Sequence, residues 1–474
     1  MSGAGARIAI VGGGFTGAAV AFHLVRSGRF ALGDVTVFEP RERIGTGLAY
    51  DTADPACRIN VPASKMSLVS SEMEAFEQWY RDSALMGSDP DALAADGHLY
   101  PRRSAFGAHV HGRMAPLVKS GLIRHIRNKV ERLVRAGRGW IVMDDQGNSH
   151  KVDIVVIATS HPAPQAPASL GRLLSGHPRF VADATIADAL SAIRPTDHVL
   201  IVGNGLTSAD VIASLTTSGH RGPVTAFSRR GLVSRGHATR PQEPWGDFTS
   251  RPIRSARILV KRVRQAIDDA AAFDVSWHAV LDAVRLQGQV IWSHLPVCER
   301  RRLVRHLRPF WDVHRFRIAP QVEDLIRRQE ALGRVRRMAA SLGPIARQGE
   351  RIDVSLRKRR GGVEHLAVDA VVVTTGPAHG GILSSTSYLG RLAEDGLVTL
   401  DPTGLGLACD LGSRILGADG GVTGSLYVAG PLARGAFGEL MGLPQVADHA
   451  RAMAEEVLGE VFGSTAGANS STAA

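Results

Sequence analysis

Hydrophobic positions in the first forty residues follow two patterns that together predict a β-turn-α-β unit. An apolar run at 7–11 predicts a buried strand, and it ends in a glycine-rich turn at 12–17. Apolar residues then recur at helical spacing as far as Val25, and a second apolar run at 35–38 ends at Glu39. An acidic residue about 20 positions beyond the last glycine is typical of a dinucleotide-binding unit.

The same opening recurs in the middle of the chain. An apolar run at 198–202 meets a second glycine-rich turn at 203–208, and a helix is predicted after it. The next apolar run, 224–228, ends at two arginines, Arg229 and Arg230, instead of an acid. The sequence therefore predicts a second unit of the same kind with the opposite charge at its strand end.

The ends of the two units also resemble each other. Residues 153–160 and 369–376 both begin Asp-x-Val-Val, continue through a threonine, and are followed closely by a proline. Two matching openings and two matching closings predict an α/β fold with two Rossmann-like domains, the second inserted into the first. The predicted boundaries are 1–165 and 378–462 for the first domain, 166–377 for the second, about 250–335 for a helical insertion within the second, and 463–474 for a disordered tail.

The first glycine turn carries the residues that a dinucleotide pyrophosphate needs. Gly12 permits the sharp turn, Gly14 lets the backbone approach the phosphates, and Gly17 lets the helix pack close to the strand. Glu39 is suited to a ribose diol and would repel a 2′-phosphate, which favours FAD or NAD(H) over NADP(H). The predicted cofactor residues of this turn are Gly12, Gly14, Phe15, Thr16, Gly17 and Glu39.

The second turn has a different preference. Guanidinium groups at Arg229 and Arg230 suit an adenosine 2′-phosphate, although they also fit a basic surface without a ligand. The predicted residues of this turn are Gly203, Gly205, Leu206, Thr207 and Ser208, and Asp210 is expected on the surface or as a cap. The simplest pairing is FAD in the first domain and NADPH in the second.

Longer motifs across most of the chain resemble a family of bacterial FAD/NAD(P)-binding proteins, distantly similar to flavin-dependent N-hydroxylating and Baeyer–Villiger monooxygenases. The motifs that carry this resemblance are 12–17, 45–50, 59–66, 100–103, 203–207, 228–231, 311–320 and 374–377. The glycine turns are generic, whereas the segments with Asn60, Arg103 and His314 are more specific.

The resemblance implies roles for further residues. Gly45, Gly47, Asn60 and Met66 would line the flavin, with Asn60 and Lys65 as candidate catalytic residues. Asn60 also fits a loop amide that caps the backbone, and Lys65 a solvent-exposed lysine. Gly430 would lie near the ribityl chain, where related flavoproteins have a Gly-Asp pair that this chain lacks. The start of the last helix, near Leu443, would face the flavin pyrimidine.

The segment 311–320 carries the candidate substrate residues His314, Arg315 and Arg317, which suit either a substrate carboxylate or bracing of the helical insertion. The resulting hypothesis is an NADPH-dependent flavoprotein monooxygenase that acts on a small, anionic metabolite and O₂. One alternative is a reductase that passes electrons to a partner without oxygen insertion. Another is a nucleotide-binding redox sensor without turnover.

The charge and composition of the chain exclude few functional classes. Residues 221–360 hold 30 Lys and Arg against 13 Asp and Glu, a net charge of +17, whereas the whole chain carries +11. A solvated helical face explains this patch better than nucleic acid, because aromatic residues are not interleaved. Without a long apolar run, a signal-like start or paired cysteines, we expect a cytoplasmic protein that binds no membrane, nucleic acid or metal and is compatible with an oligomer.

Overall fold

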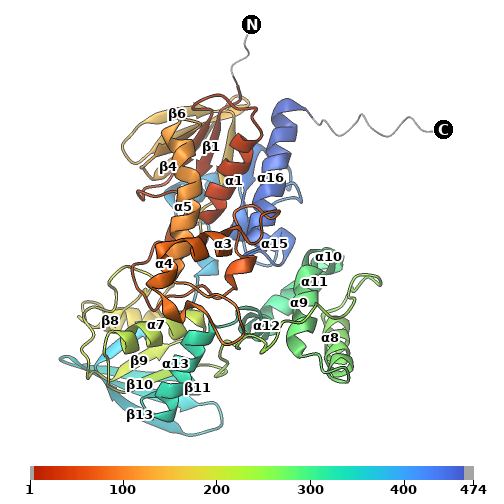
Figure 1. Cartoon of the computed structure of the whole chain (residues 1–474). Coiled ribbons are helices and arrows are strands. Elements are labelled where there is room, and N and C mark those ends of the chain that lie inside the picture. Colours follow the sequence, from red (N-terminus) through yellow and green to blue (C-terminus); the bar gives the residue numbers. More distant parts are fainter. Residues whose placement is uncertain (1–4, 464–474) are drawn as a thin grey trace.

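The computed structural model describes residues 5–463, so the predicted tail beyond Gly463 lies outside the described residues. Two large sheets form the centres of the two α/β domains, with the first sheet above and the second below in Figure 1. A three-stranded antiparallel sheet accompanies the first domain and consists of β4 (Val130–Ala136), β5 (Gly139–Asp144) and β6 (Ser149–Val152).

The first sheet combines both ends of the chain. Its strands, in spatial order, are β15 (Arg414–Leu416), β16 (Val422–Val428), β7 (Ile154–Ile157), β1 (Ile8–Val11), β2 (Val35–Phe38) and β3 (Ile123–Ile126). All pair in parallel except β15. Because β16 pairs with β7, the segment after residue 400 completes a sheet that began at residue 8.

The second sheet lies entirely within the middle of the chain. Its strands, in spatial order, are β13 (Val363–Val368), β12 (Arg351–Lys358), β11 (Val335–Gln348), β10 (Val224–Ser228), β9 (Val199–Val202), β14 (Ala370–Val373) and β8 (Phe180–Val181). The five strands from β11 to β8 are parallel, and β12 and β13 extend the sheet as an antiparallel hairpin.

The repeated sequence pattern produces the same hydrogen bonds in both domains. The carboxylate of Asp153 accepts from the Arg7 backbone N–H at 2.7 Å, and that of Asp369 accepts from the His198 N–H at 2.7 Å. These aspartates therefore fix the starts of β1 and β9 against β7 and β14. The fold class predicted from the paired openings and closings is confirmed at this level of detail.

The helices of the two domains cover these sheets. In the first domain they are α1 (Phe15–Arg26), α2 (Gly47–Tyr50), α3 (Ala75–Asp82), α4 (Ala84–Gly87), α5 (Arg103–Lys119), α14 (Ser387–Glu394), α15 (Arg434–Phe437) and α16 (Gln445–Phe462). In the second domain they are α6 (Ala168–Leu173), α7 (Leu206–Thr217) and α13 (Pro320–Ala331). Helices α1 and α16 pack side by side, so the last helix reaches the first glycine turn.

A separate helical cluster lies between β10 and α13 and projects to one side of the molecule (Figure 1). It contains α8 (Ala256–Ala271), α9 (Trp277–Leu286), α10 (Gly288–His294), α11 (Val297–His306) and α12 (Arg308–Arg315). The cluster has its own apolar core, which includes Phe248 and Val280. Helix α13, which the predicted insertion 250–335 included, instead packs against α7 and buries Val322 and Ile326 in the main core. Among residues 5–463, no helix is long and apolar enough to cross a bilayer.

Candidate functional site

The first glycine turn has space for no side chain at two positions. A Cβ on Gly12, whose φ is +100°, would lie 2.9 Å from the Ala158 carbonyl oxygen. A Cβ on Gly17 would lie 1.9 Å from the Gly12 carbonyl oxygen. Helix α1 follows Gly14 without a side-chain cap, so its first backbone N–H groups are available to an anion. This turn therefore fits a pyrophosphate.

Glu39 lies at the end of β2 and is almost completely buried beside this turn. Its carboxylate accepts from the Gly13 N–H at 3.0 Å and from the Arg41 N–H at 3.0 Å. These two bonds hold the carboxylate at the turn, where the sequence predicts the adenosine ribose. Phe15, by contrast, packs into the core with its ring 5.7 Å from that of Phe106.

Two distant segments cover the first turn. The Gly45 N–H donates to the Gly13 carbonyl at 2.8 Å, and a Cβ on Gly47 would lie 2.9 Å from the Gly14 Cα. From the other end of the chain, Gly430 has a φ of +74°, and its Cβ would lie 2.6 Å from the Thr16 hydroxyl oxygen. Gly45, Gly47 and Gly430, which the resemblance assigned to the cofactor, thus converge on the turn.

The loop with Asn60 is held in place by hydrogen bonds to buried side chains. Arg58, which is buried, donates two bonds to the Asp89 carboxylate, at 2.7 and 3.0 Å. The half-buried Asn60 receives a bond on its carbonyl from His237 Nε2 at 3.1 Å, and no hydrogen bond of its side-chain amide is recorded within residues 5–463. Met66 is buried, whereas Lys65 is exposed. The amide of Asn60 is therefore available for a ligand.

The second glycine turn repeats the geometry of the first. Gly203, with a φ of +134°, donates to the Phe227 carbonyl at 2.8 Å, as Gly12 does to Phe38 at 2.9 Å. Gly205 precedes α7 with φ −83° and ψ −163°, close to the −65° and −170° of Gly14. Helix α7, which begins with Leu206 and Thr207, also has no side-chain cap.

The second turn differs from the first because it is open. A Cβ on Gly205 would have no atom within 4 Å. The Ser208 hydroxyl and the Asn204 side-chain carbonyl are buried and have no hydrogen-bond partner among the described residues. Of the two strand-end arginines, Arg229 is exposed. Arg230 holds its guanidinium 4.9 Å from the Phe310 ring, and neither arginine forms an ion pair within residues 5–463.

Residues 9–162 match the model of the FAD-NAD(P)-binding family. The matched part contains the whole first glycine turn, Glu39 and the loop with Asn60, and the match indicates FAD and NAD(P) binding. Among curated proteins, none matches the chain in sequence.

Several solved structures have the same arrangement. Reduced ornithine hydroxylase from Pseudomonas aeruginosa is 15% identical with a TM-score of 0.63, over 95% of this chain and 98% of that one. Ornithine N-hydroxylase from Kutzneria sp. 744 is 18% identical with a TM-score of 0.60, over 96% and 99%. Thioredoxin reductase from Lactococcus lactis is 12% identical with a TM-score of 0.52, over 96% and 99%. At such identities these likenesses establish only the fold, with its two Rossmann-like domains.

The predicted substrate residues lie where the helical cluster meets the first domain. Arg315 is buried and donates to Glu439 at 2.9 Å, and Arg317 donates to Asp282 at 2.9 Å. His314 bonds the Phe310 carbonyl of its own helix at 2.7 Å. Arg315 is thus bonded to the first domain, whereas His314 is bonded within its own helix.

Arg285 completes this arginine cluster and was missed in the sequence. It donates to the Leu443 carbonyl at 2.6 Å and to the Gln445 side chain at 2.9 Å, at the start of α16. Burial, together with the nearby Arg315 charge, lowers the pKa of Arg285 to about 9. No sequence signal marked this arginine, because its contacts lie about 160 residues away along the chain.

Two further contacts between the domains were also missed. Arg103 donates to Asp210 at 2.8 Å, so Asp210 is an interdomain ion-pair partner and not the surface or capping residue expected. Burial raises the pKa of Asp210 although Arg103 opposes that shift. His237, which bonds the Asn60 loop, has its pKa lowered to about 4 by burial and by Arg317. The two contacts bring the second domain against the first, at the start of α5 and at the loop with Asn60.

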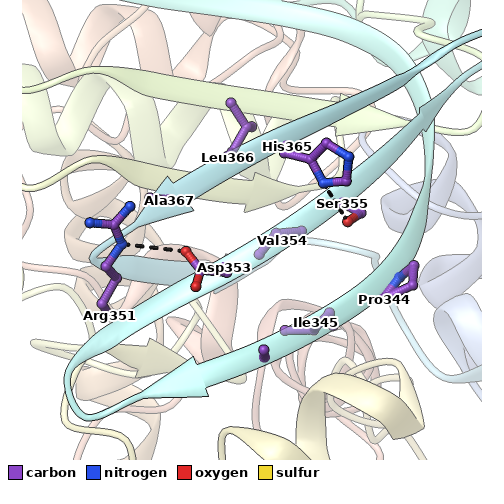
Figure 2. A pocket seen from close by; sticks show the side chains of 10 residues that line it. Pro344, Ile345, Arg351, Asp353, Val354, Ser355, His365, Leu366 and Ala367 are labelled. Carbon is purple, nitrogen blue, oxygen red and sulfur yellow. Dashed lines mark hydrogen bonds and ion pairs between the residues drawn. The ribbon is translucent and has the colours of Figure 1, made fainter.

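A pocket of about 410 Å³ lies far from both turns in the sequence, on the hairpin β11–β13. Figure 2 shows Arg351 beside Asp353 and Ser355 beside His365 on its wall, with distances of 3.3 and 3.0 Å. These polar groups are paired with one another, and none belongs to a glycine turn. We therefore assign the pocket no part in the cofactor site.

Proposed function

We propose that the chain is an NADPH-dependent, FAD-containing monooxygenase that hydroxylates the amine of a small metabolite. The observation that carries the proposal is the pair of glycine turns, which share one geometry but end in opposite charges. Glu39 at the first strand end favours an unphosphorylated ribose, and Arg229 and Arg230 at the second favour a 2′-phosphate.

The described residues fit both cofactors. The uncapped start of α1, Glu39 and the Gly430 turn would hold FAD, and the uncapped start of α7 with Arg229 would hold NADPH. Bound in this way, the two cofactors supply hydride transfer and the activation of O₂. The chain itself binds and orients them, and the segments around Gly45 and Gly430 keep water from the first turn.

The cysteines support oxygen over thiol chemistry. All three, Cys57, Cys298 and Cys409, lie within the described residues and are free. Burial raises the pKa of the Cys57 thiol to about 11 and that of Cys409 to about 12, so neither is a ready thiolate. The three cysteines therefore do not provide the dithiol pair that a disulfide reductase requires.

The arginine cluster supports an anionic substrate. Within residues 5–463, Arg315 pairs with Glu439 and Arg317 with Asp282, whereas Arg285 forms no ion pair, so one positive charge is left without a paired acid. Buried nitrogens of Arg315 (Nη2) and Arg317 (Nε) also have no partner among the described residues. A substrate carboxylate would supply both the missing charge and the missing acceptors.

The experiment measures whether oxygen from O₂ is transferred to the product. Purified protein, saturated with FAD, is supplied with NADPH, isotopically labelled O₂, and either L-ornithine or L-lysine from a panel of amino acids with side-chain amines. A monooxygenase consumes NADPH faster with its substrate and places labelled oxygen in the product. Rapid NADPH oxidation with an external acceptor, but no labelled product with any amine, identifies the electron-transfer alternative. Tight cofactor binding without turnover identifies the sensor.

A further inference from the structure

A second groove lies on the helical cluster, between α8 and α11. Its volume is about 570 Å³, and its walls are formed by Arg257, Lys261 and Arg264 from α8 and by Arg302 and His306 from α11. The three α8 residues occur at positions i, i+4 and i+7, so they form one stripe of about 10 Å along the helix. Two rows of basic side chains therefore face each other across the groove.

The charge of this groove is not neutralised by the protein. Arg257, Lys261 and Arg264 are exposed, and none of them forms an ion pair within residues 5–463. Arg302 pairs with Glu299, its neighbour on the same helix, and Asp268 is the acid among the lining residues. A solvated helical face of this length would ordinarily alternate its charges, so the stripe is arranged for an external anion.

The floor of the groove indicates which anion. Ala256, Val260 and Leu307 form an apolar strip between the two basic rows. Phosphates make no use of apolar surface, and no Phe, Tyr or Trp is among the lining residues to stack on a base. An amphipathic helix with an acidic side and an apolar side matches both features at once.

We propose that this groove is a docking site for an acidic amphipathic segment of a partner protein. The docked segment would place carboxylates against Lys261 and Arg264 and apolar side chains against Val260. This proposal does not depend on the reaction, because a partner can deliver a substrate or accept electrons.

The groove is built on a body that is fixed to the FAD domain. Trp292 of the cluster donates to the Gly435 carbonyl at 2.8 Å, and Arg301 donates to the Pro402 carbonyl at 2.6 Å. Arg301 lies on α11, next to the groove residue Arg302. A partner docked here would therefore be held at a constant position relative to the flavin domain.

The experiment measures binding of a defined probe to the full chain. The probe is a fluorescein-labelled peptide of about 18 residues, long enough for five helical turns, with Glu on one side and Leu on the other. A matched peptide carries Gln in place of Glu. We expect the Glu peptide to bind at least about tenfold more tightly than the Gln peptide, and its affinity to fall as NaCl rises from about 50 to about 200 mM.

Two charge-reversal variants locate the binding. Lys261→Glu/Arg264→Glu should weaken binding of the Glu peptide by about tenfold or more. Arg359→Glu/Arg360→Glu changes the net charge equally at an exposed turn between β12 and β13, and should leave the affinity within about twofold. If circular dichroism shows that the groove variant is unfolded, the variant Lys261→Gln/Arg264→Gln is used in its place.

Three results would overturn the proposal. One is an equal loss of affinity in both variants, which would show attraction by net charge alone. The second is equal binding of the Glu and Gln peptides. The third is displacement of the Glu peptide, at lower concentration than by unlabelled peptide, by a single-stranded oligonucleotide or by vesicles of phosphatidylglycerol, because this would assign the groove to nucleic acid or to lipid.

Discussion

The two glycine turns have nearly the same backbone but very different surroundings. Gly14 and Gly205 precede their helices with closely similar dihedral angles, and both helices contain 12 residues. Around the first turn, however, a Cβ on Gly47 would lie 2.9 Å from the Gly14 Cα, and a Cβ on Gly430 would lie 2.6 Å from the Thr16 hydroxyl oxygen. Around Gly205 nothing approaches within 4 Å of a Cβ.

Under the proposed function, this difference would distinguish a resident cofactor from an exchangeable one. A cofactor covered by two further segments of chain leaves only when those segments move, whereas one bound at an open helix end can come and go in each turnover. The residue at the last position of each turn is consistent with this difference in enclosure. Position 17 of the first turn accommodates only glycine, whereas the equivalent position of the second turn is occupied by Ser208.

Gly17→Ala should have the largest effect on the first turn. The added methyl group would overlap the Gly12 carbonyl, so the turn and the start of α1 must shift. We expect a loss of more than about 4 kcal/mol of stability and purified protein with little bound flavin, measured as flavin absorbance per chain.

Ser208→Ala is the matched control, since it removes a buried hydroxyl that has no partner. We expect it to alter stability by less than about 1 kcal/mol. Full flavin content in Gly17→Ala, or an equal loss in Ser208→Ala, would show that the two turns do not differ in tightness.

The Arg103–Asp210 pair joins the two domains, so removing one partner should disturb both sites alike. Arg103→Met leaves Asp210 without its cation, and we expect a loss of about 2–4 kcal/mol in chemical denaturation. The double variant Arg103→Met/Asp210→Leu should regain part of that loss, because it leaves no unpaired charge. A double variant less stable than the single variant would contradict this account.

The open turn is tested through its nucleotide preference. Arg229→Ala and Arg230→Ala should each raise KM for NADPH by about tenfold, the equivalent of one lost charge-assisted hydrogen bond. KM for NADH should change little, because NADH lacks the 2′-phosphate. Steady-state oxidation of both nucleotides measures the ratio, and an equal change for both would remove these arginines from phosphate binding.

The sequence predicted those parts of the fold that depend on neighbouring residues. The glycine turns, Glu39 and the two Asp-x-Val-Val closings mark strand ends, and their positions follow from the local pattern of apolar runs. Asp153 and Asp369 then form identical bonds to the starts of β1 and β9. A pattern that recurs in this way is predictable because both copies pack a strand, a glycine turn and a helix in the same arrangement.

Contacts between the domains were not predictable in this way. Arg103 and Asp210 are 107 residues apart, and neither carries a local signal for the other. Helix α13 has the same basic, amphipathic pattern as the helical cluster, so only its packing on α7 separates it from the insertion. Periodicity gives the apolar face of a helix but not the surface that covers it.

The finest difference between the two turns is a dependence on pH. The buried His449 accepts from the Gly430 N–H through Nδ1 at 3.3 Å and donates to the Ser413 hydroxyl from Nε2 at 3.0 Å. Burial lowers the pKa of His449 to about 4, so the ring is neutral in the folded protein. The Gly430 turn therefore depends on a neutral imidazole, whereas no histidine among residues 5–463 forms a hydrogen bond to the second glycine turn.

Because this pKa is below the ordinary value of about 6.5, the opened state binds the proton first. The stabilisation is complete above about pH 6.5 and declines as the pH falls toward 4. We expect FAD dissociation to accelerate by up to about tenfold per pH unit across this window, measured as fluorescence of released flavin. His449→Gln keeps an acceptor that does not titrate in this range, so it should flatten the profile. An unchanged slope in that variant would place the acid sensitivity in other buried histidines, such as His109, and would remove His449 from the closure of the first turn.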